Sequence, residues 1–130
     1  MIKYYNLEDS EVFVFEDFII NQVREGVNIV PKHNETLKKI LDTHFIRKKT
    51  VYISNRYFAY SVDPLTYLET SKLHNLMGIA IVAKTPLSKE NSKLEGIFYK
   101  KKFGVFNSLL EAMNWAKKVL EQNGNSVSHS

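Results

Sequence analysis

The sequence contains no cysteine, only three prolines and five glycines, and no long hydrophobic run. Without cysteine the chain has no disulfide, no thiolate for a metal and no thiol nucleophile. The glycines are isolated, so neither a phosphate-binding loop nor a dinucleotide-binding fingerprint is present. No apolar stretch approaches the roughly 20 residues that span a bilayer, and the N-terminal residues lack a secretory pattern. We therefore expect a cytoplasmic protein without a membrane span.

Motifs for metal binding and catalysis are also missing. His33 and His44 are eleven positions apart, which on a helix would separate them by about 16 Å. That distance is too long for one ion, and no H-x-x-x-H or G-x-S-x-G pattern occurs. The acidic residues are interpreted as solvated turn residues rather than an acid–base pair. We expect no metal, no cofactor and no enzymatic activity. These acidic residues are Glu8, Asp9, Glu11, Glu16 and Asp17.

The positive charge is modest and dispersed. The net charge is +4 and the pI is about 9.2. The basic groups 47–49, 100–102 and 117–118 each lie near the end of a predicted helix, where cations interact well with the helix dipole. We therefore expect solvated helix ends, and nucleic acid is not a predicted partner.

Short β-like segments fill the first 30 residues. Strands are predicted at Lys3–Leu7, Val12–Phe15 and Phe18–Arg24, with the pair Glu16-Asp17 spaced as a two-residue hairpin turn. A further strand is predicted at Val27–Val30, after a bend at Gly26. The N-terminal part should therefore contribute antiparallel strands.

From Pro31 onward, helices and strands alternate. Strands are predicted at Thr50–Asn55, Leu76–Ala83 and Lys102–Phe106. This order predicts an α/β fold with a mixed sheet of about five strands, an antiparallel hairpin followed by parallel βα units, and about four helices. One domain should cover residues 1–122, followed by a disordered tail, 123–130. The first predicted helix follows Pro31, and its apolar face consists of Leu37, Ile40, Leu41, His44 and Phe45. The second runs from Asp63-Pro64 to about His74, and the fourth begins at the capping box at Ser108. The third is predicted at about Ser88–Lys100, with Leu87, Leu94, Ile97 and Phe98 on one face.

The connection between the strand Thr50–Asn55 and the second helix is unusually long and aromatic. Its aromatic side chains either cover a ligand or partner groove or fold back over the end of the sheet. Ser61 precedes the helix cap Asp63 by two residues, so a phosphate on Ser61 would lie near the helix N-terminus, where Arg56 could pair with it. The candidate binding residues are Asn55, Arg56, Tyr57, Phe58, Tyr60, Ser61 and Asp63.

Four segments resemble the SpoIIAA-like (STAS/SEC14-type) small α/β domains: VYISNR (51–56), SVDP (61–64), GIAIV (78–82) and FNSLLEAMNWAKKVL (106–120). The resemblance covers residues 1–122 and implies the same fold. In the branch that antagonises anti-sigma factors, a serine at the start of the second helix is phosphorylated by a partner kinase, and Ser61 is its nearest match by position. In the SEC14-like branch a related scaffold binds lipids in an apolar cavity.

Two functions follow as hypotheses. The first is a non-enzymatic regulatory domain that binds a protein partner through the Asn55–Asp63 loop and the second helix, with phosphorylation of Ser61 as its switch. The alternative is a protein that binds a small apolar ligand or a lipid. A homodimer is also consistent with the sequence, because we expect the N-terminal strands to leave an exposed sheet edge or apolar face.

Overall fold

The computed structural model describes residues 1–124. Its strands are β1 (Lys3–Asn6), β2 (Ser10–Val14), β3 (Phe18–Val23), β4 (Asn28–Ile29), β5 (Thr50–Asn55), β6 (Ser61–Val62), β7 (Leu76–Val82) and β8 (Lys102–Phe106). Its helices are the 3-10 helix η1 (Pro31–His33), α1 (Asn34–His44), α2 (Leu65–Thr70), α3 (Pro86–Gly96) and α4 (Leu109–Gln122). The predicted tail lies, from residue 125 on, outside the described residues.

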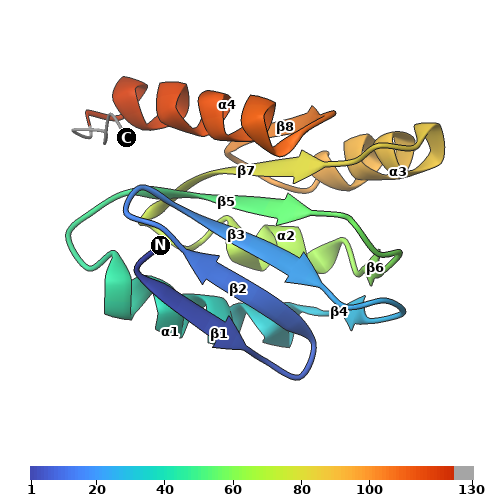
Figure 1. Cartoon of the computed structure of the whole chain (residues 1–130), viewed down its shortest axis with the longest axis horizontal. Coiled ribbons are helices and arrows are strands. Elements are labelled where there is room, and N and C mark those ends of the chain that lie inside the picture. The colour runs from blue at the N-terminus through green and yellow to red at the C-terminus, as the bar shows by residue number, and fades with distance from the viewer. Residues whose placement is uncertain (125–130) are drawn as a thin grey trace.

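Six strands form one mixed sheet in the order β1-β2-β3-β5-β7-β8 (Figure 1). Strands β1, β2 and β3 are antiparallel neighbours, whereas β3, β5, β7 and β8 run parallel. The predicted α/β class and mixed sheet are confirmed. The sheet has one strand more than expected because β1 pairs along the β2–β3 hairpin. The predicted strand at 27–30 shortens to β4, which pairs with β6 outside the main sheet.

Local sequence explains how the chain turns between these strands. Phe15 N–H donates to the carbonyl of Phe18 at 2.9 Å and closes the predicted two-residue turn. Gly26 adopts φ +78°, a left-handed conformation that glycine accepts without steric cost, and its N–H donates to Ala59 O at 2.8 Å. That bond, with the β4–β6 pair, ties the long aromatic loop to the chain after β3.

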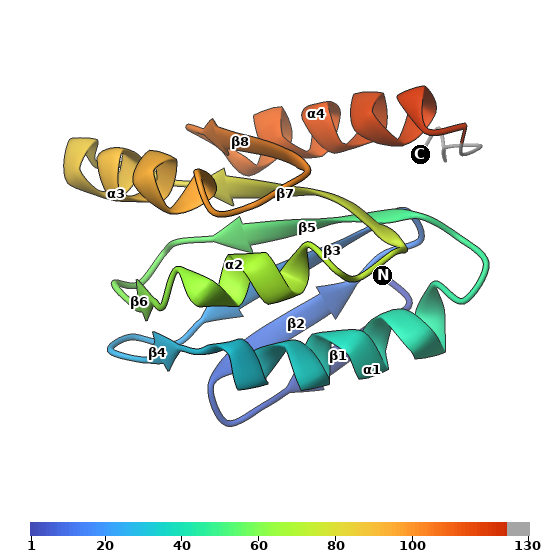
Figure 2. The same cartoon turned by 180° about the vertical axis from the view of Figure 1, so that it is seen from behind.

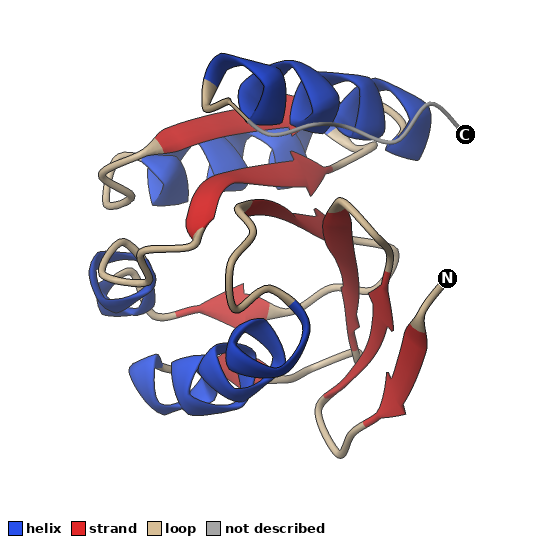
Figure 3. Ribbon diagram, turned by 90° about the vertical axis from the view of Figure 1, so that its left-hand side faces the viewer, coloured by secondary structure: helices blue, strands red, loops and turns tan. Residues whose placement is uncertain are grey.

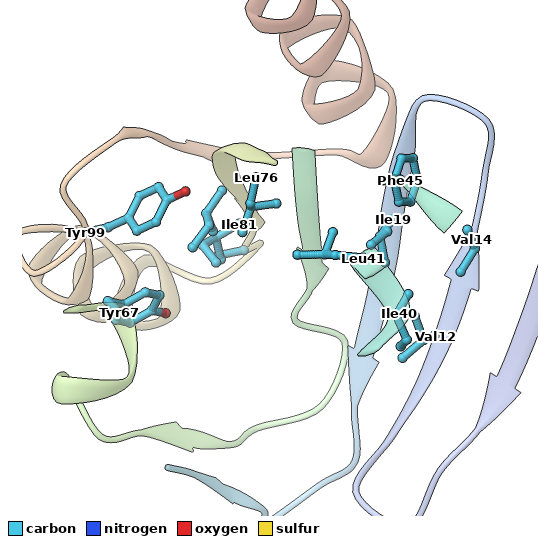
Figure 4. Close-up of a cluster of buried hydrophobic side chains, with 12 residues drawn as sticks. Val12, Val14, Ile19, Ile40, Leu41, Phe45, Tyr67, Leu76, Ile81 and Tyr99 are labelled. Carbon is cyan, nitrogen blue, oxygen red and sulfur yellow. The ribbon is translucent and has the colours of Figure 1, made fainter. Parts of the chain in front are cut away.

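The helices cover the two faces of the sheet unequally. Helices α1 and α2 lie side by side over one face, in front of the sheet in Figure 2. Helix α4 alone packs on β5, β7 and β8 from the opposite side (Figure 3). The hydrophobic residues accordingly form two clusters, one on each face. On the α1 side, Ile40 and Leu41 point towards Val12 and Ile19 of the sheet, as Figure 4 shows.

Two helices differ in extent from the sequence prediction. Helix α2 ends at Thr70 instead of His74, because the following residues turn to deliver Asn75, whose amide donates to Phe45 O at 3.0 Å. Helix α3 begins at Pro86 instead of Ser88, because Thr85 is its N-cap and accepts from Ser88 N–H at 3.1 Å. These shifts leave the number of helices at four, as predicted.

Two predicted environments are different in the structure. The apolar face of α3 is not covered by the described part of the chain: Leu87 is 71% and Ile97 70% exposed. Asp17, expected in a solvated turn, is buried and accepts a hydrogen bond from Lys48 Nζ at 2.9 Å. The Lys48 ammonium folds back over the β2–β3 turn, which explains the burial of the carboxylate.

His44 is half-buried on α1, and its Nε2 forms a hydrogen bond with Tyr5 OH at 2.7 Å.

Candidate functional site

A cavity of about 350 Å³ lies between the sheet and the helices α1 and α2. Its floor comes from β2, β3, β5 and β7, and its roof from η1, α1 and α2. The loop before β6 contributes Tyr60 to the lining, and the turn before β2 contributes Glu8 and Asp9. The lining residues are Leu7, Glu8, Asp9, Ser10, Val12, Ile19, Asn21, Val23, Ile29, His33, Asn34, Thr36, Leu37, Ile40, Tyr52, Ser54, Tyr60, Val62, Thr66, Tyr67, Thr70, Ile79 and Ile81.

Most of the cavity wall is apolar. Ile19 projects from β3, Ile79 and Ile81 project from β7, and Ile40 faces them from α1. Tyr52 on β5 is aligned with Ile79 on β7, so an aromatic ring and an aliphatic side chain share the cavity floor. Such a wall favours the apolar part of a small molecule, because its burial removes hydrocarbon surface from water.

One end of the floor carries an incompletely bonded amide. Asn21 on β3 is only 8% exposed, and its Nδ2 donates to Tyr52 OH at 2.5 Å. The other amide atom, Oδ1, has no hydrogen-bond partner among residues 1–124. Buried polar atoms are nearly always paired, so this oxygen is an exception; it has almost no accessible surface and is enclosed by protein.

A chain of polar contacts continues along the same wall. Ser54 Oγ and Tyr60 OH are 2.5 Å apart, and Arg56 Nε donates to Tyr60 OH at 3.0 Å. The Arg56 guanidinium forms a two-pronged ion pair with Glu95 of α3. Tyr67 OH on α2 donates to the same carboxylate at 2.8 Å. The loop, α2 and α3 are therefore joined through one buried charge pair behind the cavity.

Burial controls the ionisation of this wall. It raises the pKa of the Tyr52 hydroxyl well above its ordinary value. Burial and the adjacent Glu95 carboxylate together raise the pKa of Tyr67. Burial by itself lowers the pKa of Arg56, but its hydrogen bonds to Glu95 and the charges beside it raise the net value. The tyrosines therefore stay neutral and the arginine stays charged around neutral pH.

The cavity opens between the turn before β2 and the start of α1. Glu8 and Thr36 are exposed lining residues on the two sides of this opening. Across it, His33 Nε2 of η1 lies 2.8 Å from Asp9 Oδ2. Charged side chains thus surround the entrance, and neutral ones form the interior.

The predicted binding loop is divided between the cavity and the surface. Tyr60 turns inward and lines the cavity, whereas Tyr57 is 73% exposed and stacks edge-to-face on Phe58, which is 39% exposed. Asn55 ends β5 and borders a second hollow with Arg56 and Tyr57.

The two remaining loop predictions concern the start of α2. Asp63 Oδ1 accepts from Leu65 N–H at 3.1 Å, but the N-cap of α2 is Pro64, so Asp63 lies one residue before the cap and not at the cap position predicted for it. Ser61 is exposed on β6, and its hydroxyl donates to Asn28 Oδ1 at 2.9 Å. The side chain of Arg56 is only 6% exposed and is held by Glu95, so it does not face Ser61 as the sequence suggested.

Sequence reasoning missed Asn21, Tyr52, Thr66 and Thr70 as members of a site. One signal was available: Asn21 interrupts the apolar run Phe18–Val23 at a position that faces the helices. Thr66 and Thr70 occupy successive turns of α2 and carried no signal without knowledge of the α1–α2 packing. Within residues 1–124 no three metal-ligating side chains cluster, and no helix there is long and apolar enough to cross a membrane.

Comparison with solved structures identifies the architecture. The chain is similar to the crystal structure of an uncharacterised protein from Shewanella loihica PV-4, of the DUF3478 family and with a SpoIIAA-like fold. The TM-score is 0.52 at 13% identity, over 89% of this chain and 92% of the other. No family model matches the sequence, and no curated protein matches it either. At this identity the similarity establishes the SpoIIAA-like fold, as the sequence predicted.

Proposed function

We propose that this SpoIIAA-like domain binds a small, mostly apolar molecule in the cavity between the sheet and helices α1 and α2. The observation that carries the proposal is the cavity itself, whose wall is formed largely by apolar side chains of the sheet and of α1. The proposal involves binding without a chemical step.

The size of the cavity restricts the ligand. Its volume of about 350 Å³ is near the lower end of the range of small-molecule pockets. We therefore infer a single-chain or small cyclic compound rather than a two-chain lipid. Its apolar body would contact Ile19, Ile40 and Ile79, and each Å² of apolar surface buried would contribute about 25 cal/mol.

Filling the cavity tests this function. Octan-1-ol is titrated into the wild-type protein and into Ile79→Phe by isothermal titration calorimetry. Ile79 is buried on the cavity floor, so the larger ring should occupy the ligand's space and abolish binding. Met77→Phe is the matched control, because Met77 lies on the same strand and packs on the α4 side. Saturable binding lost only in Ile79→Phe supports the function, and equal binding by both variants contradicts a cavity site.

The exposed pair Tyr57 and Phe58 favours a second function, the docking of a protein partner on the Asn55–Asp63 loop. Phosphorylation of Ser61 would add negative charge beside Asp63 and replace the hydroxyl that bonds Asn28, which would alter this surface. The test compares Tyr57→Ala and Ser61→Glu with Leu110→Ala, a control at an exposed position on α4. A specific partner should be lost in the first two variants only; retention by all three contradicts docking at the loop.

A further inference from the structure

We propose that the segment 84–102, which contains α3 and the turn after it, docks this protein on the surface of an anionic lipid bilayer. Its exposed apolar side chains would insert between the lipid head groups, and its lysines would bind the head-group phosphates. This inference goes beyond the cavity and involves none of the residues that line it. It follows from three features of the segment: the orientation of the helix, the local charge and the position in the fold.

Helix α3 packs with its small side chains inward and its large apolar side chains outward. Ser92 is buried, and Gly96 lies so close to the Phe103 ring that no Cβ would fit between them. Because a helix turns about 100° per residue, Leu87 and Leu94 lie on the side opposite this contact. The exposed apolar side chains of α3 and the following turn are Leu87, Leu94, Ile97 and Phe98. A contiguous exposed group of this kind marks a docking surface.

Polar contacts hold α3 in this orientation. The Glu95 carboxylate accepts hydrogen bonds from the Arg56 guanidinium and from Tyr67 OH of α2. At the N-terminus of the helix, the Thr85 hydroxyl accepts from Ser88 N–H. The helix cannot turn its leucines inward without separating the ion pair between Glu95 and Arg56, which is costly because both side chains are buried. The apolar side chains therefore stay on the surface.

The net positive charge of the chain belongs to this segment, although basic residues occur throughout the sequence. Residues 84–102 contain six lysines and two glutamates, so the segment has a net charge of +4, equal to that of the whole chain. Four of these lysines are exposed and form no ion pair within residues 1–124: Lys84, Lys93, Lys100 and Lys102. Exposed apolar side chains flanked by lysines are typical of helices that lie in the interface of an anionic bilayer.

The charge also selects among the possible occupants of this surface. In a symmetric dimer formed through α3, two segments of net charge +4 would face each other and repel. An anionic bilayer supplies the complementary charge, and its fluid interface accepts protruding side chains without a matching groove. Helix α3 lies beyond the carboxyl end of β7, at one end of the molecule (Figure 1 and Figure 2). A flat lipid surface can therefore contact it.

Co-sedimentation of the full chain with sucrose-loaded vesicles tests this inference. Wild-type protein should bind vesicles of phosphatidylcholine with about 30% phosphatidylglycerol at least about tenfold more tightly than vesicles of phosphatidylcholine alone. Ile97→Ser should weaken binding to the anionic vesicles about tenfold. Ile46→Ser is the matched control, because Ile46 is 69% exposed beside the basic group 47–49 but lies after α1, and it should preserve binding. Lys93→Gln should weaken binding about fivefold, whereas Lys39→Gln, the same change at an exposed position of α1, should not.

Three results would overturn the inference: no binding to either vesicle, equal binding to both, or equal losses within each matched pair of variants. Concentration-dependent dimerisation of the wild-type protein that Ile97→Ser abolishes, without vesicle binding, would assign the surface to a second copy of the chain and also overturn it. Should a variant fail to fold, the comparison of anionic with neutral vesicles on the wild-type protein still decides. The titration of octan-1-ol into the cavity is a separate measurement, so the two proposals fail independently.

Discussion

Asn21 and Tyr52 meet across the parallel strands β3 and β5, with the amide nitrogen 2.5 Å from the phenol oxygen. This contact joins two polar side chains at one end of a cavity floor that is mostly apolar. The amide oxygen of Asn21 is enclosed and has no hydrogen-bond partner among residues 1–124. Both residues line the proposed cavity, and the four predictions below test the framework around it.

The ion pair between Arg56 and Glu95 should be important for stability. The two side chains are only 6% and 15% exposed, so removing one charge leaves the other buried without compensation. Glu95→Gln should therefore lower the free energy of unfolding by roughly 3–5 kcal/mol. Asp42→Asn is the control, because the pair between Lys38 and Asp42 is exposed and should contribute at most about 1 kcal/mol. Urea denaturation measures both, and similar losses in the two variants would contradict the prediction.

Tyr99 should respond to mutation in the opposite direction from Tyr67. The Tyr99 hydroxyl is buried and has no hydrogen-bond partner within the described chain, whereas Tyr67 OH donates to Glu95. Tyr99→Phe should leave the free energy of unfolding unchanged or raise it by about 1 kcal/mol, because it removes an unpaired polar atom. Tyr67→Phe should lower it by about 1–3 kcal/mol. Chemical denaturation of both variants tests the contrast, which a large loss in Tyr99→Phe would refute.

Lys101 should stabilise the turn that leads into β7. Its ammonium donates to Leu73 O at 2.6 Å and to Leu76 O at 2.7 Å, and burial lowers its pKa. Lys101→Met leaves both carbonyls without this donor and should cost about 1–3 kcal/mol. Lys102→Met, at the exposed neighbouring position, should change the free energy of unfolding by less than about 0.5 kcal/mol. Thermal unfolding of both variants is the measurement, and equal midpoints would count against the prediction.

Alkaline pH should destabilise the fold. Burial raises the pKa values of Tyr52, Tyr67 and Tyr99 above the ordinary value of 10. The folded protein therefore retains these protons above pH 10, whereas the unfolded chain releases them. Because the unfolded state then binds fewer protons, the free energy of unfolding falls as the pH rises above about 10.

Tyrosinate absorbance and circular dichroism, recorded together against pH, test this alkaline transition. The three buried tyrosines should ionise only as helical and strand structure is lost. Their ionisation near pH 10 in a protein that remains folded would show that their hydroxyls are not buried as described.

The sequence was sufficient for most of the backbone. The two-residue turn at Glu16-Asp17 and the capping serine Ser108 were readable because each acts through neighbours in the chain. Lys48, in contrast, is 31 positions from Asp17 in the sequence. The local sequence pattern could not show this contact and therefore predicted a solvated aspartate. Element order is local information, whereas the environment of a side chain depends on contacts distant in sequence.

The cavity lay beyond sequence reasoning for the same reason. Its members come from many separate segments, and few of them, among them Asn21 and Ser54, interrupt an apolar strand. The aromatic loop drew attention by its length and composition, yet it contributes only Tyr60 to the cavity besides Val62 of β6. Helix α3 does carry the predicted apolar residues. The periodicity of the sequence, however, does not reveal that Leu87 and Ile97 remain exposed.

The most direct test of the cavity proposal is an NMR measurement of the contacts that octan-1-ol makes with the isotope-labelled protein. We predict intermolecular nuclear Overhauser effects from the alkyl chain to the methyl groups of Ile79 and the ring of Tyr52, with a shift of the Asn21 side-chain amide. Contacts confined to Tyr57 and Phe58, or to Trp115 on the α4 side, would contradict the account.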